Sequence, residues 1–370
     1  MRELRELTTI RIGGAAAELL APATREQLIE TSRRVWATGD DWIALGGGSN
    51  LVVADDGIAG TVIHVVTRGI ERLPGDGVAL RVQAGEPWEG LVAFAVEQGW
   101  SGIEALSGIP GSCGAAPIQN IGAYGQELSS TLLSIEFLDF PSGELLRLSA
   151  AELELGYRRS VLKGGRPGVV VSIDIALSEN DRALSDAIDY AQLADALGVT
   201  VGDRLPVARV RAAVLALRGS KGMLLDPADP DSVSAGSFFT NPIVSAEFAR
   251  SLPSDVPRWP VEGRAADADF AIITPLESYQ PGALAPRAVA EPRGMKLSAA
   301  WLIEHSGVTR GFRLPGSRAA VSTKHSLAIV NTGDATAVQV AELARYIQTR
   351  VLGAYGVVLQ PEPVLVGVQL

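Results

Sequence analysis

The stretch SGIPGSCGAAPIQNIGAYGQE, residues 107–127, contains five glycines and almost no side chain that could fill a hydrophobic core. An ordered loop of this length inside a compact domain usually has a function. Because glycine lacks a Cβ, the backbone N–H groups of such a loop can approach a ligand closely. We therefore interpret residues 107–127 as a ligand-binding surface made of backbone, around which the fold is arranged.

A second glycine loop, GGGSN at residues 46–50, directly follows a predicted strand at 41–45. Its N–H groups can converge on an anion, and Ser49 and Asn50 add side-chain donors. It lacks both the lysine of a P-loop and the helix that follows a dinucleotide-binding GxGxxG motif. Alone, the pattern fits a glycine-rich hairpin turn equally well. Two such loops in one domain suit a pyrophosphate and a flat ring lying against backbone.

The first half of the chain alternates strand and helix patterns. Thr24 and Gln27 form a capping box at the start of a predicted helix that ends at Gly39. A second helix is predicted over residues 87–99, with Pro87 in its first turn. Strands are predicted at 16–23, 41–45, 61–66, 80–84, 133–139 and 168–177. This order indicates a mixed α/β layer structure.

The second half contains more helix. Helices are predicted at 186–198, 205–222, 295–307 and 334–356, and strands at 237–244, 325–331 and 357–367. Residues 251–293 are rich in proline, alanine and arginine and have little periodicity. We interpret them as an extended loop or a surface insertion.

Composition excludes several classes of protein. The 370 residues carry a net charge of −10, which argues against a general nucleic-acid binder. Cys113 is the only cysteine, so no internal disulfide is possible, as expected in a reducing cytoplasm. Three scattered histidines indicate no metal site. The N-terminus lacks the apolar core of a signal peptide, and no apolar run is long enough to cross a bilayer.

Six segments together resemble one known family. IRIGG, ALGGGSNLVVADDGIAGTVI, IPGSCGAAPIQNIGAYGQE, YRRS, GSFFTNP and LQPEPV occur in this order. They resemble the UDP-N-acetylenolpyruvoylglucosamine reductases, flavoenzymes that make UDP-N-acetylmuramate for peptidoglycan. The resemblance extends from about residue 8 to the end. The segment that contains Tyr190 and the PIQN motif resemble the sequences of the longer subtype, in which a loop closes over the substrate.

The resemblance implies an α+β fold. It would combine a two-part α/β FAD-binding domain of the vanillyl-alcohol-oxidase type with a separate α/β substrate-binding domain. The expected divisions are 1–70 joined by a C-terminal strand at 356–370, then 71–222, and 223–355 for the substrate domain. FAD would be bound without a covalent link. The residues expected to hold it are Leu45, Gly46, Gly47, Gly48, Ser49, Asn50, Ser107, Gly108, Ile109, Pro110, Gly111, Ser112, Gly114, Ala115, Gln119, Asn120, Gly122, Ala123, Tyr124 and Gly125.

Cys113 departs from the family pattern, which has a small apolar residue at this position. Related flavin folds sometimes attach FAD through a cysteine or histidine. We interpret Cys113 as a small packed thiol instead.

Three residues are candidates for catalysis. Taken by itself, Arg158 in YRRS fits a pair of surface arginines, and Ser237 fits a satisfied core hydroxyl. Glu362 lies between two prolines, neither of which has an N–H, so its segment must be an edge strand or line a cavity. A carboxylate there is solvated or functional.

The resemblance places Arg158, Ser237 and Glu362 on the family's catalytic positions. It implies that NADPH reduces the flavin and leaves, and that hydride then passes from the flavin to C3 of the enolpyruvyl ether. Ser237 would protonate C2. Arg158 and Glu362 would stabilise the negative charge that develops toward the substrate carboxylate.

The implied substrate is UDP-N-acetylglucosamine enolpyruvate. The residues expected to bind it are Tyr190, Arg218, Lys221, Asn241, Trp259 and His325. A second departure is Val364, where longer-subtype enzymes can have an arginine that contacts phosphate. That contact would have to come from elsewhere, for instance from residues 258–293.

Two other functions remain open at this point. One is an FAD oxidoreductase of the same fold acting on another substrate, and the other is a nucleotide-sugar binder without activity. We expect a cytoplasmic monomer that binds neither nucleic acid nor membrane.

Overall fold

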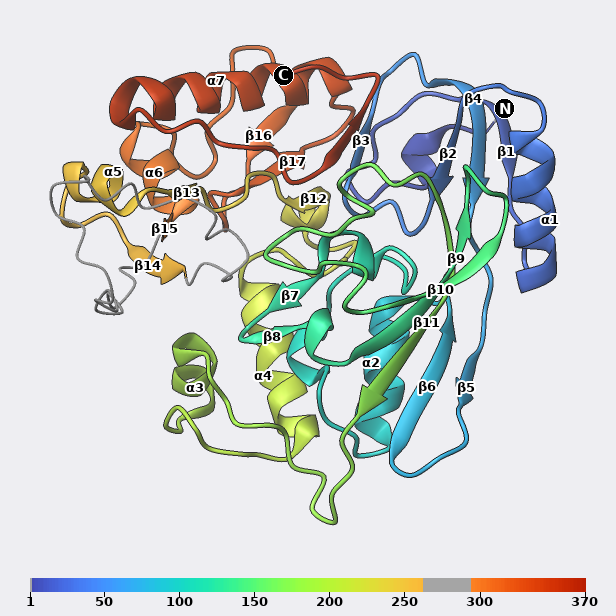
Figure 1. The fold of residues 1–370 in the computed structure, drawn as a ribbon. Helices are drawn as coiled ribbons and strands as arrows, with labels where there is room; N and C mark the ends of the chain where they lie inside the picture. The colour runs from blue at the N-terminus through green and yellow to red at the C-terminus, as the bar shows by residue number, and fades with distance from the viewer. Residues whose placement is uncertain (1, 262–293) are drawn as a thin grey trace, which may run out of the picture. The chain divides into compact units, whose positions relative to one another are not determined.

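The computed structural model describes residues 2–261 and 294–370 (Figure 1). The chain divides into two compact units. The first contains Met1–Phe238, Arg310–Arg345 and Glu362–Leu370, and the second contains Phe239–Thr309 and Tyr346–Pro361. The predicted insertion at 251–293 falls largely outside the described residues.

The first unit begins with a three-stranded parallel sheet in the order β1–β4–β2. Its strands are β1 (Ala16–Leu20), β4 (Ile58–His64) and β2 (Trp42–Leu45). The helix α1 (Arg25–Trp36) starts where the capping box predicts, because the Thr24 hydroxyl accepts the N–H of Gln27 at 3.2 Å. This helix contacts both β4 and the second sheet.

The second sheet is antiparallel, in the order β10–β9–β11–β6–β5. Its strands are β10 (Leu145–Ser149), β9 (Leu132–Asp139), β11 (Gly168–Leu177), β6 (Val78–Gln83) and β5 (Ile70–Arg72). The helix α2 (Trp88–Glu97) follows β6, and α4 (Val207–Ser220) packs alongside α2 (Figure 1). One hydrophobic cluster joins this sheet to α1 and α2, with Leu28, Trp88 and Ile173 at most 1% exposed.

Further short elements of the first unit surround the glycine loops. They are α3 (Ala191–Leu197), the hairpin β7 (Gly122–Ala123) and β8 (Gln126–Glu127), the sheet β12 (Ser234–Ser237), β17 (Ala328–Asn331) and β16 (Ala319–Val321), and the parallel pair β3 (Leu51–Val53) and β18 (Val364–Val366). The pairing of β18 with β3 brings the C-terminal segment beside the first glycine loop.

The second unit contains a three-stranded sheet and two short helices. The sheet has the order β13 (Ile243–Val244), β15 (Gly294–Leu297) and β14 (Arg258–Val261), and the helices are α5 (Ala246–Ser251) and α6 (Ala299–His305). The helix α7 (Ala337–Tyr355) begins in the first unit and ends in the second.

Mixed α and β elements in both halves confirm the predicted α+β class, but three element predictions are wrong. Residues 295–307 form a strand and then a helix, because Gly294–Leu297 pairs on both sides and Ser298 caps α6. The predicted strand 237–244 is interrupted, since β12 ends at Ser237 and buries the two phenylalanines that follow. The predicted strand 357–367 is a continuous strand only over Val364–Val366, after the two prolines, and Pro361 makes a single isolated bridge with Phe239.

Candidate active site

The two glycine loops lie in direct contact. A Cβ added to Gly47 would meet the Cα of Gly111 at 2.6 Å, so only glycine allows the two backbones to come this close. The Ser49 hydroxyl fixes the contact by donating to the carbonyl of Pro110 at 3.0 Å. The two glycine loops, which lie about sixty residues apart in the sequence and were predicted to form one ligand surface, thus meet in the fold.

The long loop remains largely irregular, as its composition predicts, apart from a 3-10 turn at Ala116–Gln119 and the hairpin β7–β8. Asn120 and Tyr124 adopt left-handed backbone angles, with φ of 46° and 48°. The Asn120 amide donates to the Glu127 carboxylate at 3.0 Å and to the carbonyl of Gly156 at 3.2 Å. The side chain of Asn120 therefore holds the loop itself, and a contact with a cofactor would fall to its backbone.

A cavity of about 450 Å³ opens on the first glycine loop. Its lining includes Thr8, Arg11, Gly46, Gly47 and His64. Backbone amides of a glycine turn beside an arginine suit an anionic diphosphate. Neither Thr8 nor Arg11 is among the residues predicted to bind a ligand, although Arg11 lies in the IRIGG segment that supports the resemblance.

A smaller cavity of about 220 Å³ borders the end of the long glycine loop at Tyr124 and Gly125. Glu104, Asp186 and Asp189 line it, and no lysine or arginine does. This charge balance excludes it as a diphosphate site.

Arg158 and Glu362 form an ion pair. The distance from Arg158 Nε to Glu362 Oε1 is 2.8 Å, and the side chains are 22% and 11% exposed. The Arg158 guanidinium also donates to the carbonyl of Gly122 at 3.1 Å, which ties it to the long glycine loop. The neighbouring Arg159 is 71% exposed and pairs with Glu154 at the surface. The two arginines of YRRS thus differ: Arg158 is largely buried and pairs with Glu362, whereas Arg159 lies at the surface.

Backbone hydrogen bonds anchor Glu362 to both neighbouring segments. Its N–H donates to the carbonyl of Phe238, the residue after Ser237, at 2.9 Å. Two residues later, the N–H of Val364 donates to the carbonyl of Asn50 in the first glycine loop at 2.9 Å. As predicted for the segment in which Glu362 lies between two prolines, the strand β18 that follows it is paired on one side only, with β3. These bonds bring the Ser237, Glu362 and Arg158 segments together.

Ser237 is half-buried at the end of β12, where it pairs with Ala328 of β17. The preceding Gly236 has a φ of 74°, which turns the strand at this point. Within residues 2–261 and 294–370, the Ser237 hydroxyl has no hydrogen-bond partner. Among these residues, the hydroxyl is therefore not satisfied in the way that a core serine would be.

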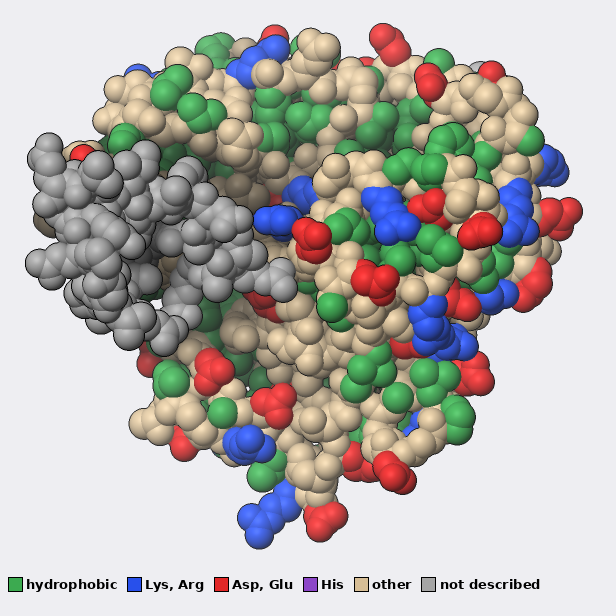
Figure 2. Space-filling model, in the orientation of Figure 1, with side chains coloured by type: hydrophobic (Ala, Val, Ile, Leu, Met, Phe, Trp, Pro, Cys, Tyr) green, Lys and Arg blue, Asp and Glu red, His purple; other side chains and the backbone are tan. Residues whose placement is uncertain are grey.

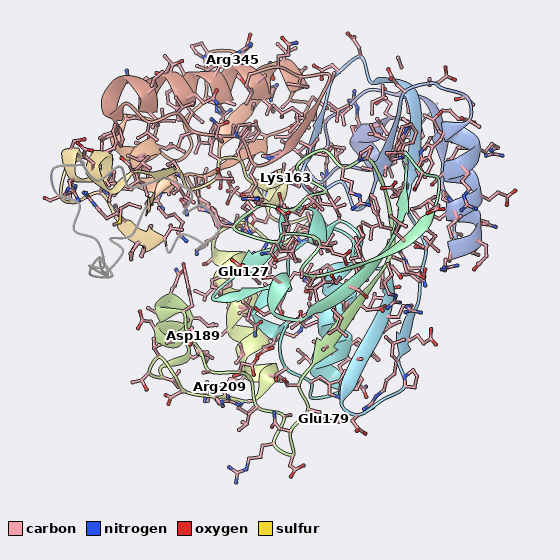
Figure 3. All side chains as sticks on the ribbon, in the orientation of Figure 1. Glu127, Lys163, Glu179, Asp189, Arg209 and Arg345 are labelled. Atoms are coloured by element: carbon pink, nitrogen blue, oxygen red, sulfur yellow. The ribbon has the colours of Figure 1, made fainter. Side chains whose placement is uncertain are left out.

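The carboxyl group of Glu362 is shifted toward its neutral form. Burial raises its pKa, and the positive charges of Arg158 and then Lys163 oppose this rise. Lys163, labelled in Figure 3, comes from the turn that follows YRRS. Burial lowers the pKa of Lys163, and Glu362 opposes that shift. A carboxyl with a raised pKa beside an arginine can donate a hydrogen bond or a proton.

Two of the predicted substrate residues meet at Tyr124. Tyr190 caps α3 at its start and packs edge-on against Tyr124, with ring centroids 5.8 Å apart. The Lys221 ammonium lies 5.5 Å from the centroid of the same ring and donates to the Gln192 side chain at 3.0 Å. Tyr124, which the sequence assigned to the cofactor, thus lies among the residues assigned to the substrate. Gln192 was missed, although it follows Tyr190 by two positions.

Positive charge gathers around His325. Burial and then the nearby charges of Lys221, Arg218 and Arg310 lower its pKa to about 4, so the imidazole is neutral at pH 7. Arg218 is 8% exposed and donates to the carbonyl of Met223 at 3.0 Å. Its buried Nε has no hydrogen-bond partner among the described residues. An arginine left unsatisfied in this way suits an anionic ligand.

Asn241 and Trp259 belong to the second unit. The Asn241 side-chain oxygen accepts the N–H of Ala299 at 3.0 Å, at the start of α6. Trp259 is 47% exposed on β14. Val364, which stands where longer-subtype enzymes can have an arginine, is 49% exposed. Most of the segment 258–293, which was proposed to supply the phosphate contact in its place, lies outside the described residues.

Cys113 is fully buried in the hydrophobic core. Burial raises the pKa of its thiol well above the ordinary value. A buried, protonated thiol is a poor nucleophile.

Within residues 2–261 and 294–370, no group of three or more His, Cys, Asp or Glu side chains is arranged to hold a metal ion. No helix in that part of the chain is long and apolar enough to cross a membrane.

Comparison with known proteins gives concordant matches. Residues 16–149 match the model of an FAD binding domain, and residues 227–366 match the C-terminal domain of UDP-N-acetylenolpyruvoylglucosamine reductase. The reductase of Leifsonia xyli is 58% identical and aligns with 99% of this chain and 98% of its own. That of Thermobifida fusca is 45% identical, with 99% and 97% covered. The crystal structure of the Thermus caldophilus reductase superimposes with a TM-score of 0.63 at 27% identity, covering 99% of this chain and 97% of that one.

Proposed function

The chain belongs to the UDP-N-acetylenolpyruvoylglucosamine reductase family, and from this premise we propose how its own residues perform the reaction. The enzyme reduces UDP-N-acetylglucosamine enolpyruvate to UDP-N-acetylmuramate for peptidoglycan synthesis, using FAD and NADPH. It is a UDP-N-acetylmuramate dehydrogenase. The single observation that supports the mechanism is the ion pair between Arg158 and Glu362, in which the backbone of Glu362 also bonds the residue that follows Ser237.

FAD, held by the two glycine loops, would supply the hydride-transfer chemistry that links NADPH to C3 of the enolpyruvyl double bond. The contact between Gly47 and Gly111, together with Arg11 in the adjoining cavity, fits a cofactor diphosphate lying against backbone. Ser237 gives its proton to C2, so that hydride and proton together saturate the double bond. Arg158 stabilises the negative charge that develops on the substrate carboxylate. Glu362, whose pKa burial raises, donates a hydrogen bond to the same charge.

Several finer statements belong to the same proposal. The buried thiol of Cys113 favours FAD held without a covalent bond. Positive and negative side chains are interspersed on the face in Figure 2, which favours a small-molecule partner over nucleic acid. We also propose a monomer located in the cytoplasm, with cofactor domain parts at 1–70 and 71–222 and a substrate domain at 223–355.

Anaerobic half-reactions test the function directly. The purified protein should be yellow, NADPH should bleach its flavin, and UDP-N-acetylglucosamine enolpyruvate should restore the colour. Flavin that NADPH bleaches but this substrate does not reoxidise would indicate an oxidoreductase with another substrate. A colourless protein that cannot be loaded with FAD yet binds UDP-sugars would indicate a binder without activity.

Lys221 serves the substrate diphosphate in this proposal. Lys221→Ala should raise the KM for the UDP substrate by about tenfold to a hundredfold, because one charge-assisted contact is lost. Flavin content should remain normal, since the contacts of Lys221 are with Gln192 and Tyr124. Steady-state kinetics and flavin absorbance measure the two effects.

Arg182→Ala provides the control, because it removes a positive charge from an exposed loop. It should leave KM unchanged. Loss of flavin from Lys221→Ala, with an unchanged KM in the remaining holoenzyme, would assign Lys221 to the cofactor instead.

A further inference from the structure

We propose that Asn50 and Gln119 are positioning residues that orient the carboxyl group of Glu362, rather than only cofactor contacts. The inference rests on the proposed catalytic role of Glu362. Asn50 lies in the first glycine loop and Gln119 at the end of the 3-10 turn in the second. Their amides form a chain of hydrogen bonds that ends on the Glu362 carboxyl.

The direction of this chain is fixed by a backbone group. The Nδ2 of Asn50 donates to the main-chain carbonyl of Glu362 at 3.2 Å, and a carbonyl can only accept. The same Nδ2 donates to Oε1 of Gln119 at 2.8 Å. The Nε2 of Gln119 is therefore turned toward Glu362, where it lies 3.3 Å from Oε1. The identity of each amide atom follows from one carbonyl oxygen.

The two oxygens of Glu362 consequently differ. Oε1 accepts a hydrogen bond from Nε2 of Gln119 at 3.3 Å. Nε of Arg158 lies 2.8 Å from the same oxygen as an ion-pair contact, but its N–H makes no hydrogen bond among residues 2–261 and 294–370. No hydrogen bond to Oε2 forms within those residues. A proton on Oε1 would face the N–H of Gln119, so the neutral acid carries its proton on Oε2. Oε2 is the oxygen that meets the substrate, and Gln119 fixes which oxygen that is.

This assignment explains why both amides lie where they do. Asn50 and Gln119 are about half-buried, and their side-chain amides form hydrogen bonds with each other and with Glu362. One amide comes from each glycine loop, so the carboxyl group is oriented only when the two loops are in contact. A residue needed for flavin alone would require no such chain.

The test compares the two half-reactions in Gln119→Leu. The variant should keep its flavin and its rate of reduction by NADPH. Reoxidation by UDP-N-acetylglucosamine enolpyruvate should slow by about tenfold to a hundredfold, as for a lost hydrogen bond to a charged group. Because Gln119 donates to the carboxylate, its loss should also move the pH dependence of reoxidation to higher pH.

Further variants define the role. Asn50→Asp replaces the donor by an acceptor and should slow reoxidation as well. The effects of Asn50→Asp and Gln119→Leu should not add, because Asn50 acts largely through Gln119. Gln339→Leu is the matched control, since it removes an amide that bonds the N–H of Arg318. It should change neither half-reaction.

Three outcomes overturn the inference. Gln119→Leu could lose flavin and regain full activity when FAD is restored, which would make Gln119 a cofactor residue. It could slow reoxidation without moving the pH profile, which would indicate a merely structural role. It could also leave reoxidation unchanged while Glu362→Gln slows it. An unimpaired Glu362→Gln would instead refute the proposed role of Glu362 on which the inference rests.

Discussion

Ser237→Ala should still be bleached by NADPH at close to the normal rate, whereas its reoxidation by the enolpyruvyl substrate should slow by about two to four orders of magnitude. Transfer of hydride from NADPH needs no proton from Ser237. Reduction of the enol ether does, because C2 must be protonated to finish the product. Stopped-flow absorbance of the flavin measures the two steps separately.

The surroundings of Ser237 make this separation a sharp test. Its hydroxyl has no partner among the described residues, so its removal costs the fold no hydrogen bond. Ser234→Ala is a matched control on the same strand, where the hydroxyl accepts the N–H of Gly236 at 3.2 Å. That control should leave reoxidation close to normal.

Ser237→Cys should retain more activity than Ser237→Ala, since a thiol can still donate a proton. If hydride transfer precedes protonation, the alanine variant should exchange hydrogen between the flavin and C3 without making product. Equal slowing of both half-reactions would show that Ser237 is a packing residue. Unchanged reoxidation would eliminate it as the acid.

Arg158→Met should slow reoxidation by about a hundredfold to a thousandfold, because it removes a cation aimed at charge that develops in the transition state. It also leaves the buried carboxyl of Glu362 without its nearest positive charge. Arg158→Lys should recover only part of the rate, since an ammonium cannot reproduce the fork that reaches both Glu362 and the carbonyl of Gly122.

The pH dependence of Arg158→Met gives a second readout. Arg158 opposes the rise in the pKa of Glu362, so its loss should raise that pKa further. If Glu362 acts as the neutral acid, the alkaline limb of the reoxidation profile should move to higher pH. Movement of the acidic limb instead would show that the carboxylate is the active form.

Arg159→Met is the matched control for this experiment. Arg159 is the adjacent residue of the same type, but it is 71% exposed and pairs with Glu154. It should change neither rate nor pH profile. Equal effects of the two substitutions would contradict the assignment of Arg158 to the site.

Local pattern predicted the long, regular elements well. The strand 168–177 and the cap at Thr24 agree with the structure because a short, mostly apolar run and capping chemistry both act over a few residues. Residues 295–297 became a strand because β13 and β14 both pair with β15, and nothing nearby in the sequence encodes those partners. Short edge strands such as β10 and β18 were missed or overextended for the same reason.

The candidate site was predictable as a set of residues but not as a set of contacts. Glycine content identified both loops, and motif resemblance identified Arg158, Ser237 and Glu362. The sequence could not show that the Asn120 side chain bonds to residues of its own loop, or that Gln119 is turned toward Glu362. These facts depend on backbone carbonyls brought together from distant segments.

The placement of Glu362 also has a consequence for biosynthesis. Asn50 and Glu362 are 312 positions apart, yet the second must dock beside the first before the site exists. Nascent chains tend to fold from the N-terminus, and contacts between remote segments form late. The two glycine loops are therefore made long before Glu362, and a chain truncated before residue 362 would contain both loops without the carboxyl group that pairs with Arg158.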